Sequence, residues 1–513
     1  MLCRFQAVSL LFMSLAVSVQ SSPIWGQTSV TTWHYNNGRT SANTHETILT
    51  PANVNVQQFM KLFTQPVDGQ VVGEPLYLPN VTIPVQGTHN VVYVATMHDS
   101  VYAFDADSNA GANASPLWKK SLLVSGATSV PISAQGCGGV TAWTEVGVVS
   151  TPVIDTSTGT LYVVAKTDEG GTLVNRLHAL DVATGNEKFG GPVKINATFT
   201  YSGKTYTFSN LHEVNRPGLL LVNGNVYIAF GSNGCNSGDQ GWILAYSAST
   251  LQPVGAFDDM PGKFFAAIWQ KGGGISADSS GNIYAETGDG QVVPGVDLAE
   301  SVFRLSQVGN ALSLSDWFTP YNWSTLTAND QDFDQAVVIL PNQRGTYPHL
   351  AIATNKTGTL YLLNRDNMGH ICSTCMTGDS QIVQEVPKLF GPETGTPVFW
   401  NNTVYSTGQA VPIKAFKMKN GLLSTTPAAQ SMKVAGGGHA VISANGTTNG
   451  ILWVINGGQL FAFNAANLSV LYTSAQAPNG RDTLPPLAHF ATLTEVNGKV
   501  YVGTKTSLVV YGP

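Results

Sequence analysis

The chain has 513 residues, of which 43% are hydrophobic and only 11% are charged. This balance is that of an ordered globular protein and excludes an intrinsically disordered one, which needs low hydrophobicity and high charge. The net charge of −6 is spread thinly, so a nucleic-acid partner, which requires a basic face, is not expected. After the N-terminus no run reaches the ~18–20 apolar residues that span a bilayer, so no transmembrane segment is expected.

The N-terminal stretch differs from the rest of the chain. Arg4 precedes an apolar run over residues 7–19, and small and polar residues follow it up to Gln27. A positively charged start, an apolar run and a small-residue region are typical of a secretory signal peptide. We therefore predict that residues 1–27 are a leader for a secreted or periplasmic protein, and that residues 28–513 form a single domain.

Residues 91–108, VVYVATMHDSVYAFDADS, contain two runs in which apolar residues alternate with small or polar ones, on either side of a polar turn at 97–99. Alternation with period two marks half-buried strands, and two such runs around a tight turn predict a β-hairpin. A further strand-like run, QQFMKLFTQPV at 57–67, precedes this hairpin and has no partner of its own.

The hairpin recurs along the chain. Its second half, VYAFD at 101–105, has counterparts such as LHALD at 177–181 and LYLLN at 360–364, and eight such units can be traced. Repeated four-stranded antiparallel units predict an all-β fold, an eight-bladed β-propeller. Because the last unit has only three strands, we expect the N-terminal strand at 57–67 to complete the last blade and remove the free sheet edges.

The second unit, TLYVVAKTDEGGTLVNRLHALDVATGNEKF, resembles the repeat of the pyrroloquinoline-quinone (PQQ) propellers. The matching positions are the aromatic residue of the second strand, the Ala-Leu-Asp of the third, and the Thr-Gly and closing aromatic residue of the fourth: Tyr162, Ala179, Leu180, Asp181, Thr184, Gly185 and Phe189. The whole chain is similar to secreted bacterial PQQ-like propellers, with which it shares the opening WHYNNGRTSANTHETILTPANV. The resemblance implies the same fold for nearly everything after the leader.

Two branches of this family imply different functions. The quinoprotein alcohol dehydrogenases bind PQQ and calcium on the propeller axis, whereas the scaffold propeller of the outer-membrane β-barrel assembly machinery has no cofactor. The dehydrogenases imply adjacent cysteines against PQQ; here the closest pair, Cys372 and Cys375, is separated by two residues and followed by Met376, not by the histidine of a haem site. PQQ and calcium are thus implied by the resemblance only, and a non-catalytic scaffold is expected.

In a propeller, the loops before the first strands and those between the second and third strands open on one face. Polar residues gather in the loops before the first strands: Glu74, Glu145, His212, Glu213, Arg216, Gln270, Asp332, Asp334, Glu393, His439 and His489. Such convergence is the geometry of a small-molecule or metal site, so we expect a ligand or partner protein at this axial mouth; a merely solvated channel is the alternative. No motif identifies a metal or a catalytic residue.

Two acidic stretches have alternating side chains of the kind seen in calcium loops, at 105–109 and 330–334. The first has Ala110 and Pro116 where a helical calcium loop needs glycine and an acid. We expect turns in both places, in which Asp and Asn side chains bond their own backbone.

Removing the leader leaves four cysteines, an even number in an exported chain. Cys372 and Cys375 stand in a Gly/Ser/Thr-rich loop without the second pair of a zinc site, so we expect a structural disulfide between them. Cys137 and Cys235 lie in glycine-rich loops of neighbouring units that open on the same face. We expect a second disulfide there, with two free buried thiols as the alternative.

Three functions are compatible with these features. The first is a scaffold that binds a ligand or a protein on its axial face, and the second is a quinoprotein-type oxidoreductase with an altered site. The third is a carbohydrate-active propeller, because Trp143, Trp269 and Trp323 fall in loops near the same mouth and can stack on sugars. The protein is expected to be a monomer.

Overall fold

The computed structural model describes residues 27–135 and 143–513, except for 233–239, 264, 266, 435 and 437. The predicted leader lies outside the described residues apart from Gln27, and so do Cys137 and Cys235, whose pairing therefore stays a prediction. Within the described ranges, α1 (Trp323–Ala328) is the single α-helix, and no helix is long and apolar enough to cross a membrane.

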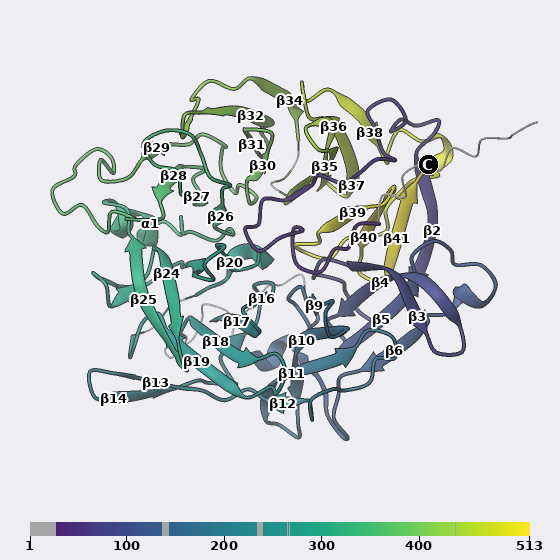
Figure 1. The fold of residues 1–513 in the computed structure, drawn as a ribbon, viewed down its shortest axis with the longest axis horizontal. Coiled ribbons are helices and arrows are strands. Elements are labelled where there is room, and N and C mark those ends of the chain that lie inside the picture. Colours follow the sequence, from purple (N-terminus) through teal and green to yellow (C-terminus); the bar gives the residue numbers. More distant parts are fainter. Residues whose placement is uncertain are drawn as a thin grey trace, which may run out of the picture.

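The strands form eight small, largely antiparallel sheets arranged in a ring (Figure 1). Four of these sheets have four strands, and the other four have five or six. This is the predicted eight-bladed β-propeller. Blade 1 contains β3 (Leu76–Ile83), β4 (Gly87–Thr96), β5 (Ser100–Asp105) and β6 (Trp118–Ser121), and blade 2 contains β7 (Thr128–Pro131), β8 (Glu145–Val146), β9 (Val153–Asp155), β10 (Thr160–Asp168), β11 (Leu173–Asp181) and β12 (Val193–Lys194). Blade 3 contains β15 (Glu213–Val214), β16 (Leu220–Val222), β17 (Asn225–Ser232), β18 (Trp242–Ser247) and β19 (Pro253–Asp258). Blade 4 contains β20 (Ser276–Ala277), β21 (Ile283–Glu286), β24 (Val302–Val308) and β25 (Ala311–Phe318).

The second half of the ring repeats the same arrangement. Blade 5 contains β26 (Val338–Ile339), β27 (Leu350–Thr354), β28 (Leu360–Asn364) and β29 (Gln384–Val386), and blade 6 contains β30 (Val398–Trp400), β31 (Thr403–Ser406), β32 (Pro412–Lys419), β33 (Leu422–Leu423) and β34 (Ala429–Lys433). Blade 7 contains β1 (Ala42–Asn43), β35 (Ala440–Asn445), β36 (Thr448–Asn456), β37 (Gln459–Asn464) and β38 (Val470–Thr473). Blade 8 contains β39 (Leu493–Val496), β40 (Lys499–Gly503), β41 (Ser507–Gly512) and β2 (Met60–Pro66). Two further hairpins, outside the blades, are β13 (Thr198–Tyr201) with β14 (Lys204–Thr207) and β22 (Val292–Val293) with β23 (Asp297–Leu298).

The hairpin predicted at 91–108 is the β4–β5 pair of blade 1, with the predicted turn between Thr96 and Ser100. Its apolar side chains belong to one buried cluster with side chains of blade 2, such as Leu161, and of blade 8, such as Val510. A hairpin alone is barely stable in water, so burial against two neighbouring blades is what stabilises it.

The N-terminal strand closes the ring as predicted. β2 pairs antiparallel with β41, the last strand of the chain, with Thr64 opposite Val509. Strands from the two ends of the folded chain thereby share one blade and close the ring, and β2 is the outer strand of that blade.

In four of the units, the tyrosine that recurs in the second strand connects its blade to the next one. The Tyr93 hydroxyl donates to the Val182 carbonyl of blade 2 over 3.0 Å, and Tyr162 donates to Ala248 of blade 3 over 2.6 Å. Tyr501 of blade 8 completes the ring by donating to Ala106 of blade 1. The repeat therefore places one buried hydroxyl where the following blade offers a carbonyl, and this satisfies both groups away from water.

Residues 28–46, here called the plug segment, cross the middle of the ring (Figure 1). Its backbone carbonyls accept hydrogen bonds from backbone N–H groups of strands in blades 2, 4, 5, 6 and 7. The pairs are Thr31 with Ile154, Asn37 with Ala277, Gly38 with Ile339, Thr40 with Phe399, and Ser41 with Ile442. Trp33, His34 and Arg39 are fully buried within it. The segment has no strand periodicity, so its sequence predicts no element there.

Candidate functional site

A pocket of about 600 Å³ opens at the axial mouth, among the loops of blades 4 to 8. It is formed by loops before first strands and loops between second and third strands, the two loop types predicted to share a face. Its lining residues are Trp269, Lys271, Asp330, Asp334, Lys356, Glu393, Gly395, Gln409, Gly436, Gly438, His439, Ile455, Asn456, Gly457, Leu487, Ala488, His489, Phe490 and Ala491. Asp334, Glu393, His439 and His489, four of the predicted site residues, therefore line one pocket.

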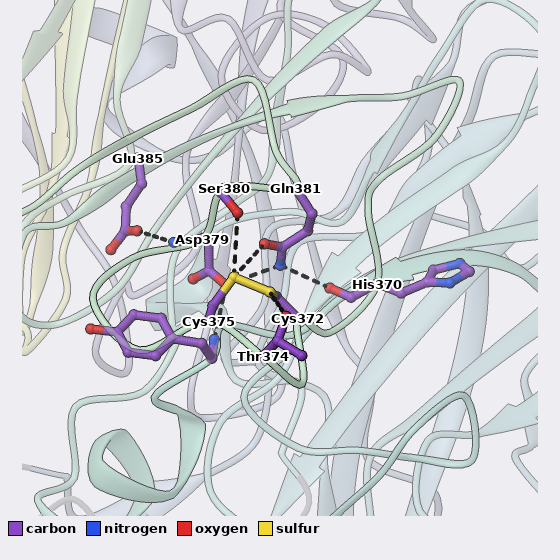
Figure 2. The surroundings of a disulfide bond; sticks show 9 residues. His370, Cys372, Thr374, Cys375, Asp379, Ser380, Gln381 and Glu385 are labelled. Carbon is purple, nitrogen blue, oxygen red and sulfur yellow. Dashed lines mark hydrogen bonds between the residues drawn. A yellow bond between two sulfur atoms is a disulfide. The ribbon is translucent and has the colours of Figure 1, made fainter.

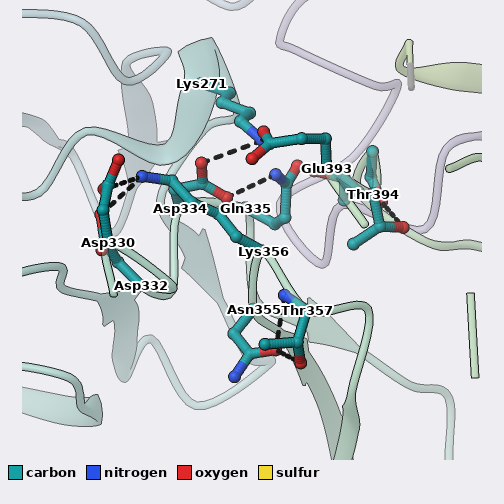
Figure 3. Close-up of polar contacts among 12 residues, drawn as sticks. Lys271, Asp330, Asp332, Asp334, Gln335, Asn355, Lys356, Thr357, Glu393 and Thr394 are labelled. Atoms are coloured by element: carbon teal, nitrogen blue, oxygen red, sulfur yellow. Dashed lines mark hydrogen bonds and ion pairs between the residues drawn. The ribbon is translucent and has the colours of Figure 1, made fainter. Parts of the chain in front are cut away.

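Two lysines organise the acidic residues of this pocket (Figure 3). The Lys271 ammonium lies 3.0 Å from the Asp334 carboxylate and 2.7 Å from that of Glu393. Lys356 binds Asp330, and it lies 3.0 Å from Asp332. Burial alone would lower the pKa of Lys271, but Asp334 and Glu393 outweigh it and raise the pKa, so this lysine stays charged. Neither lysine was among the predicted site residues.

Arg216 supports the pocket from behind. Its guanidinium is fully buried and donates to the backbone carbonyls of Val149 and Lys271, each over 2.9 Å, and burial lowers its pKa to about 9. The cation also lies 5.0 Å from the ring centre of Phe490. Gly272 makes this possible, because a Cβ at that position would lie 2.0 Å from the guanidinium. Arg216 therefore positions Lys271 and Phe490 and does not itself line the pocket.

An aromatic wall adjoins the charged groups. Trp269 and Phe490 line the pocket, and Trp143 lies between them, 6.2 Å from Trp269 and 6.5 Å from Phe490 between ring centres. Trp143 is buried, whereas Trp269 and Phe490 are half-buried. The pocket thus offers apolar ring surface beside fixed hydrogen-bonding groups, a combination common to small-molecule sites.

His439 lies where the pocket meets the plug segment. Its Nδ1 accepts a hydrogen bond from the Thr396 backbone, and its ring centre lies 5.4 Å from Trp33 and 5.8 Å from His34. Burial lowers the pKa of His439 to about 3, so the ring is neutral at physiological pH and Nε2 carries its proton. His439 therefore lines the pocket and packs against the plug segment.

The other predicted site residues lie outside the pocket lining. Gln270 is buried and donates to the Gln335 carbonyl, and Glu145 contacts His98 over 3.1 Å. His212 precedes β15 of blade 3, and Glu213 begins that strand and accepts a hydrogen bond from the Gln240 backbone. Glu74 is buried beside the plug segment and accepts a hydrogen bond from the His34 backbone. Sharing a loop type therefore did not suffice to place these side chains in the pocket.

A cluster of three carboxylates lies beside the pocket. One oxygen each of Asp289, Glu300 and Asp332 lies within 4.8 Å of the others, and Asp332 also contacts Lys356. Burial and the charge of Asp332 raise the pKa of Glu300 to about 9 and that of Asp289 to about 7. Asp289 and Glu300 were not predicted, because they are eleven residues apart in an irregular segment with no motif.

The two stretches compared with calcium loops differ in the structure. At 105–109 the Asp105 side chain accepts hydrogen bonds from the backbones of Asp107 and Ser108, which is the predicted turn. At 330–334 the acidic side chains instead bind the two pocket lysines. The turn expected there was therefore the wrong interpretation of these carboxylates, because lysines distant in sequence provide stronger partners than the local backbone.

The disulfide predicted between Cys372 and Cys375 is present, in the loop between β28 and β29 (Figure 2). Cys375 also contacts Ser380 and Gln381 of the same loop. The bridge closes a very short loop, and neither cysteine lines the axial pocket. Its role is local and structural.

Replacing both Cys372 and Cys375 with serine is expected to lower the free energy of unfolding by no more than about 2 kcal/mol, since the entropy gained by opening so short a loop is small. Chemical denaturation of the oxidised protein and the double variant checks this. A loss larger than about 4 kcal/mol would mean that the bridge organises more than its own loop.

Comparisons with known proteins place the fold but not the function. No family model and no curated protein matches the chain. Among solved structures, it is similar to quinohemoprotein alcohol dehydrogenase from Comamonas testosteroni, with a TM-score of 0.61 and 15% identity over 94% of this chain and 80% of that one. For a europium-containing methanol dehydrogenase the TM-score is 0.58 and the identity 12%, over 94% of this chain and 98% of that one. For BamB from Moraxella catarrhalis the TM-score is 0.52 and the identity 11%, over 89% of this chain and 100% of that one. The expected likeness to the quinoprotein propellers is thus confirmed for the fold.

Proposed function

We propose that this chain is an exported, non-catalytic propeller whose axial pocket binds a small, neutral molecule rich in hydroxyl groups. The observation that carries the proposal is that both lysines of the pocket already form ion pairs with carboxylates. Two lysines, Lys271 and Lys356, face the carboxylates of Asp330, Asp334 and Glu393, and His439 is neutral. Such a lining offers donors and acceptors to a neutral ligand, but no free positive charge to an anion. Export rests on the predicted leader.

The aromatic residues support the same class of ligand. A sugar ring has an apolar face that packs on an aromatic ring and an edge of hydroxyls that bind charged groups. Trp269 and Phe490 supply the first kind of surface, and the ion pairs of Lys271 supply the second. A pocket of about 600 Å³ falls in the range of small-molecule sites.

The pocket does not fit PQQ. PQQ carries three carboxylates, and the lining has one more acidic group than basic groups, with both lysines already engaged. Adjacent cysteines are also absent from the sequence. The carboxylates of PQQ would meet a lining with an excess of negative charge, and like charges repel. We therefore propose no quinone chemistry for this site.

Binding is tested by calorimetry and thermal shift with neutral mono- and disaccharides, uronic acids, and PQQ with calcium. A neutral sugar is expected to bind, and Trp269→Ala to weaken it about tenfold, because stacking on an aromatic ring contributes about 1 kcal/mol or more. Trp323→Ala is the matched control, since Trp323 lies outside the pocket lining. Tight binding of PQQ, or PQQ-dependent dye reduction, would favour the oxidoreductase alternative.

A further inference from the structure

His489 is the one titratable side chain of the axial pocket for which the described part of the chain supplies no hydrogen-bond or ion-pair partner. Both lysines and all three carboxylates of the lining take part in ion pairs, and His439 binds the Thr396 backbone. His489 is exposed and contacts Phe490 of the aromatic wall, with 3.9 Å between ring centres. Its ring nitrogens are therefore available to a ligand that packs on the same wall.

The charges that act on His489 come from two other loops. Partial burial of the ring lowers its pKa most, followed by the positive charges of Arg216, which precedes β16, and of Lys271, which precedes β20. The other titratable side chains of the lining are Asp330, Asp334, Lys356, Glu393 and His439. The His489 ring is therefore neutral at pH 7.5, and it gains a proton only below its ordinary pKa of 6.5.

A proton on His489 changes which ligands the pocket attracts. At pH 7.5 the lining has one more acidic group than basic groups, so an anion meets an excess of negative charge. The protonated ring adds a positive charge that is not paired with any carboxylate of the described residues. Phe490 contacts this ring and also the buried Arg216 cation, which lies 5.0 Å from its ring centre. A sugar ring that packs on Phe490 therefore lies near two positive charges once His489 is protonated.

We propose that His489 decides whether the axial pocket accepts sugar acids. With a neutral His489 ring the pocket binds neutral sugars, and with a protonated ring it also binds uronic acids, which carry a carboxylate on the sugar ring. This inference rests on the proposed function, since the sugar ring itself must pack on Trp269 and Phe490.

Isothermal titration of the full-length protein with galactose and with galacturonate, each at pH 7.5 and at pH 5, tests the proposal. The two probes share one ring and differ in a hydroxymethyl group or a carboxylate, which stays ionised at both pH values. The dissociation constant of galacturonate is expected to fall about fivefold between pH 7.5 and pH 5, the worth of one partly exposed ion pair. That of galactose is expected to change less than about twofold, because it carries no charge.

His489→Gln keeps a neutral hydrogen-bonding side chain that cannot take up a proton, so the effect of pH on galacturonate binding is expected to fall below about twofold. His349→Gln, the same change at an exposed histidine outside the pocket lining, is the matched control and should keep the wild-type ratio. Burial also raises the pKa of Asp334, whose protonation at pH 5 would favour an anion as well. A pH effect that persists in His489→Gln would therefore assign it to Asp334 and overturn the proposal.

By linkage, bound galacturonate is expected to raise the pKa of His489, which NMR titration of its ring protons measures in the free and the loaded protein. Galactose binding together with a galacturonate affinity that is the same at both pH values would overturn this inference alone. Absence of binding by both probes at both pH values would overturn the proposed function and this inference with it.

Discussion

Replacing Arg39 with methionine is expected to lower the free energy of unfolding by about 4 kcal/mol or more, because several buried acceptors lose their donors at once. The guanidinium is fully buried and donates to the carbonyls of Ile275, Trp33 and Leu219 and to the Thr32 hydroxyl. It thereby ties the plug segment to the first strands of blades 3 and 4. Each acceptor left without a partner away from water costs about 1–3 kcal/mol.

Urea denaturation followed by tryptophan fluorescence measures this effect, since Trp33 lies in the same segment. Arg344→Met, the same change at an exposed position, is the control and is expected to alter stability by less than about 0.5 kcal/mol. If Arg39→Met lost less than about 1 kcal/mol, the plug segment would not be fixed by this side chain.

Between pH 6.5 and pH 8, the free energy of unfolding of the wild-type protein is expected to fall relative to that of Glu74→Gln by about 2 kcal/mol. Burial raises the pKa of Glu74 to about 8, opposed by hydrogen bonding to His34 and by the charge of Arg39. In the unfolded chain the same carboxyl has its ordinary pKa near 4.5. In this window the folded protein therefore holds a proton that the unfolded chain has lost, so rising pH favours unfolding.

The window begins at pH 6.5 for a physical reason. Burial lowers the pKa of His34 and His439, and these groups act in the opposite direction below pH 6.5, where only the unfolded chain binds their protons. Denaturation curves of both proteins at several pH values give the difference directly. Glu145→Gln, the same change at a half-buried carboxylate, is the control for the substitution itself. If the free energies of unfolding of Glu74→Gln and wild type changed equally between pH 6.5 and pH 8, Glu74 would be ionised in the folded state throughout this range.

The sequence by itself was sufficient to predict the blades. Period-two alternation decides which side chains face a neighbouring sheet, and it is a local property that each unit repeats. The tyrosine of the second strand recurs in most units, and the hydroxyls of Tyr93 and Tyr162 each donate to a carbonyl of the following blade. The missing strand of the last unit and the orphan run at 57–67 then had one consistent solution, the pairing of β2 with β41.

The site could be predicted only in part. That loops of one kind share a face follows from the alternating direction of the strands, and this placed Asp334, Glu393, His439 and His489 at one pocket. Which side chains point into the pocket depends on irregular loop backbone that no period encodes. Lys271 enters it while the adjacent Gln270 turns into the core, and both have a positive φ.

Contacts between segments distant in sequence were decided by the tertiary structure alone. Asp289, Glu300 and Asp332 meet because blades 4 and 5 are neighbours, and Arg39 reaches Ile275 across 236 residues because the plug segment crosses the ring. Sequence pattern determined the repeating blades, since strand pairing depends on local alternation. Only the closed ring determined the pocket, the carboxylate cluster and the plug segment, because each depends on charges and hydrogen-bonding groups that come together when eight blades share one axis.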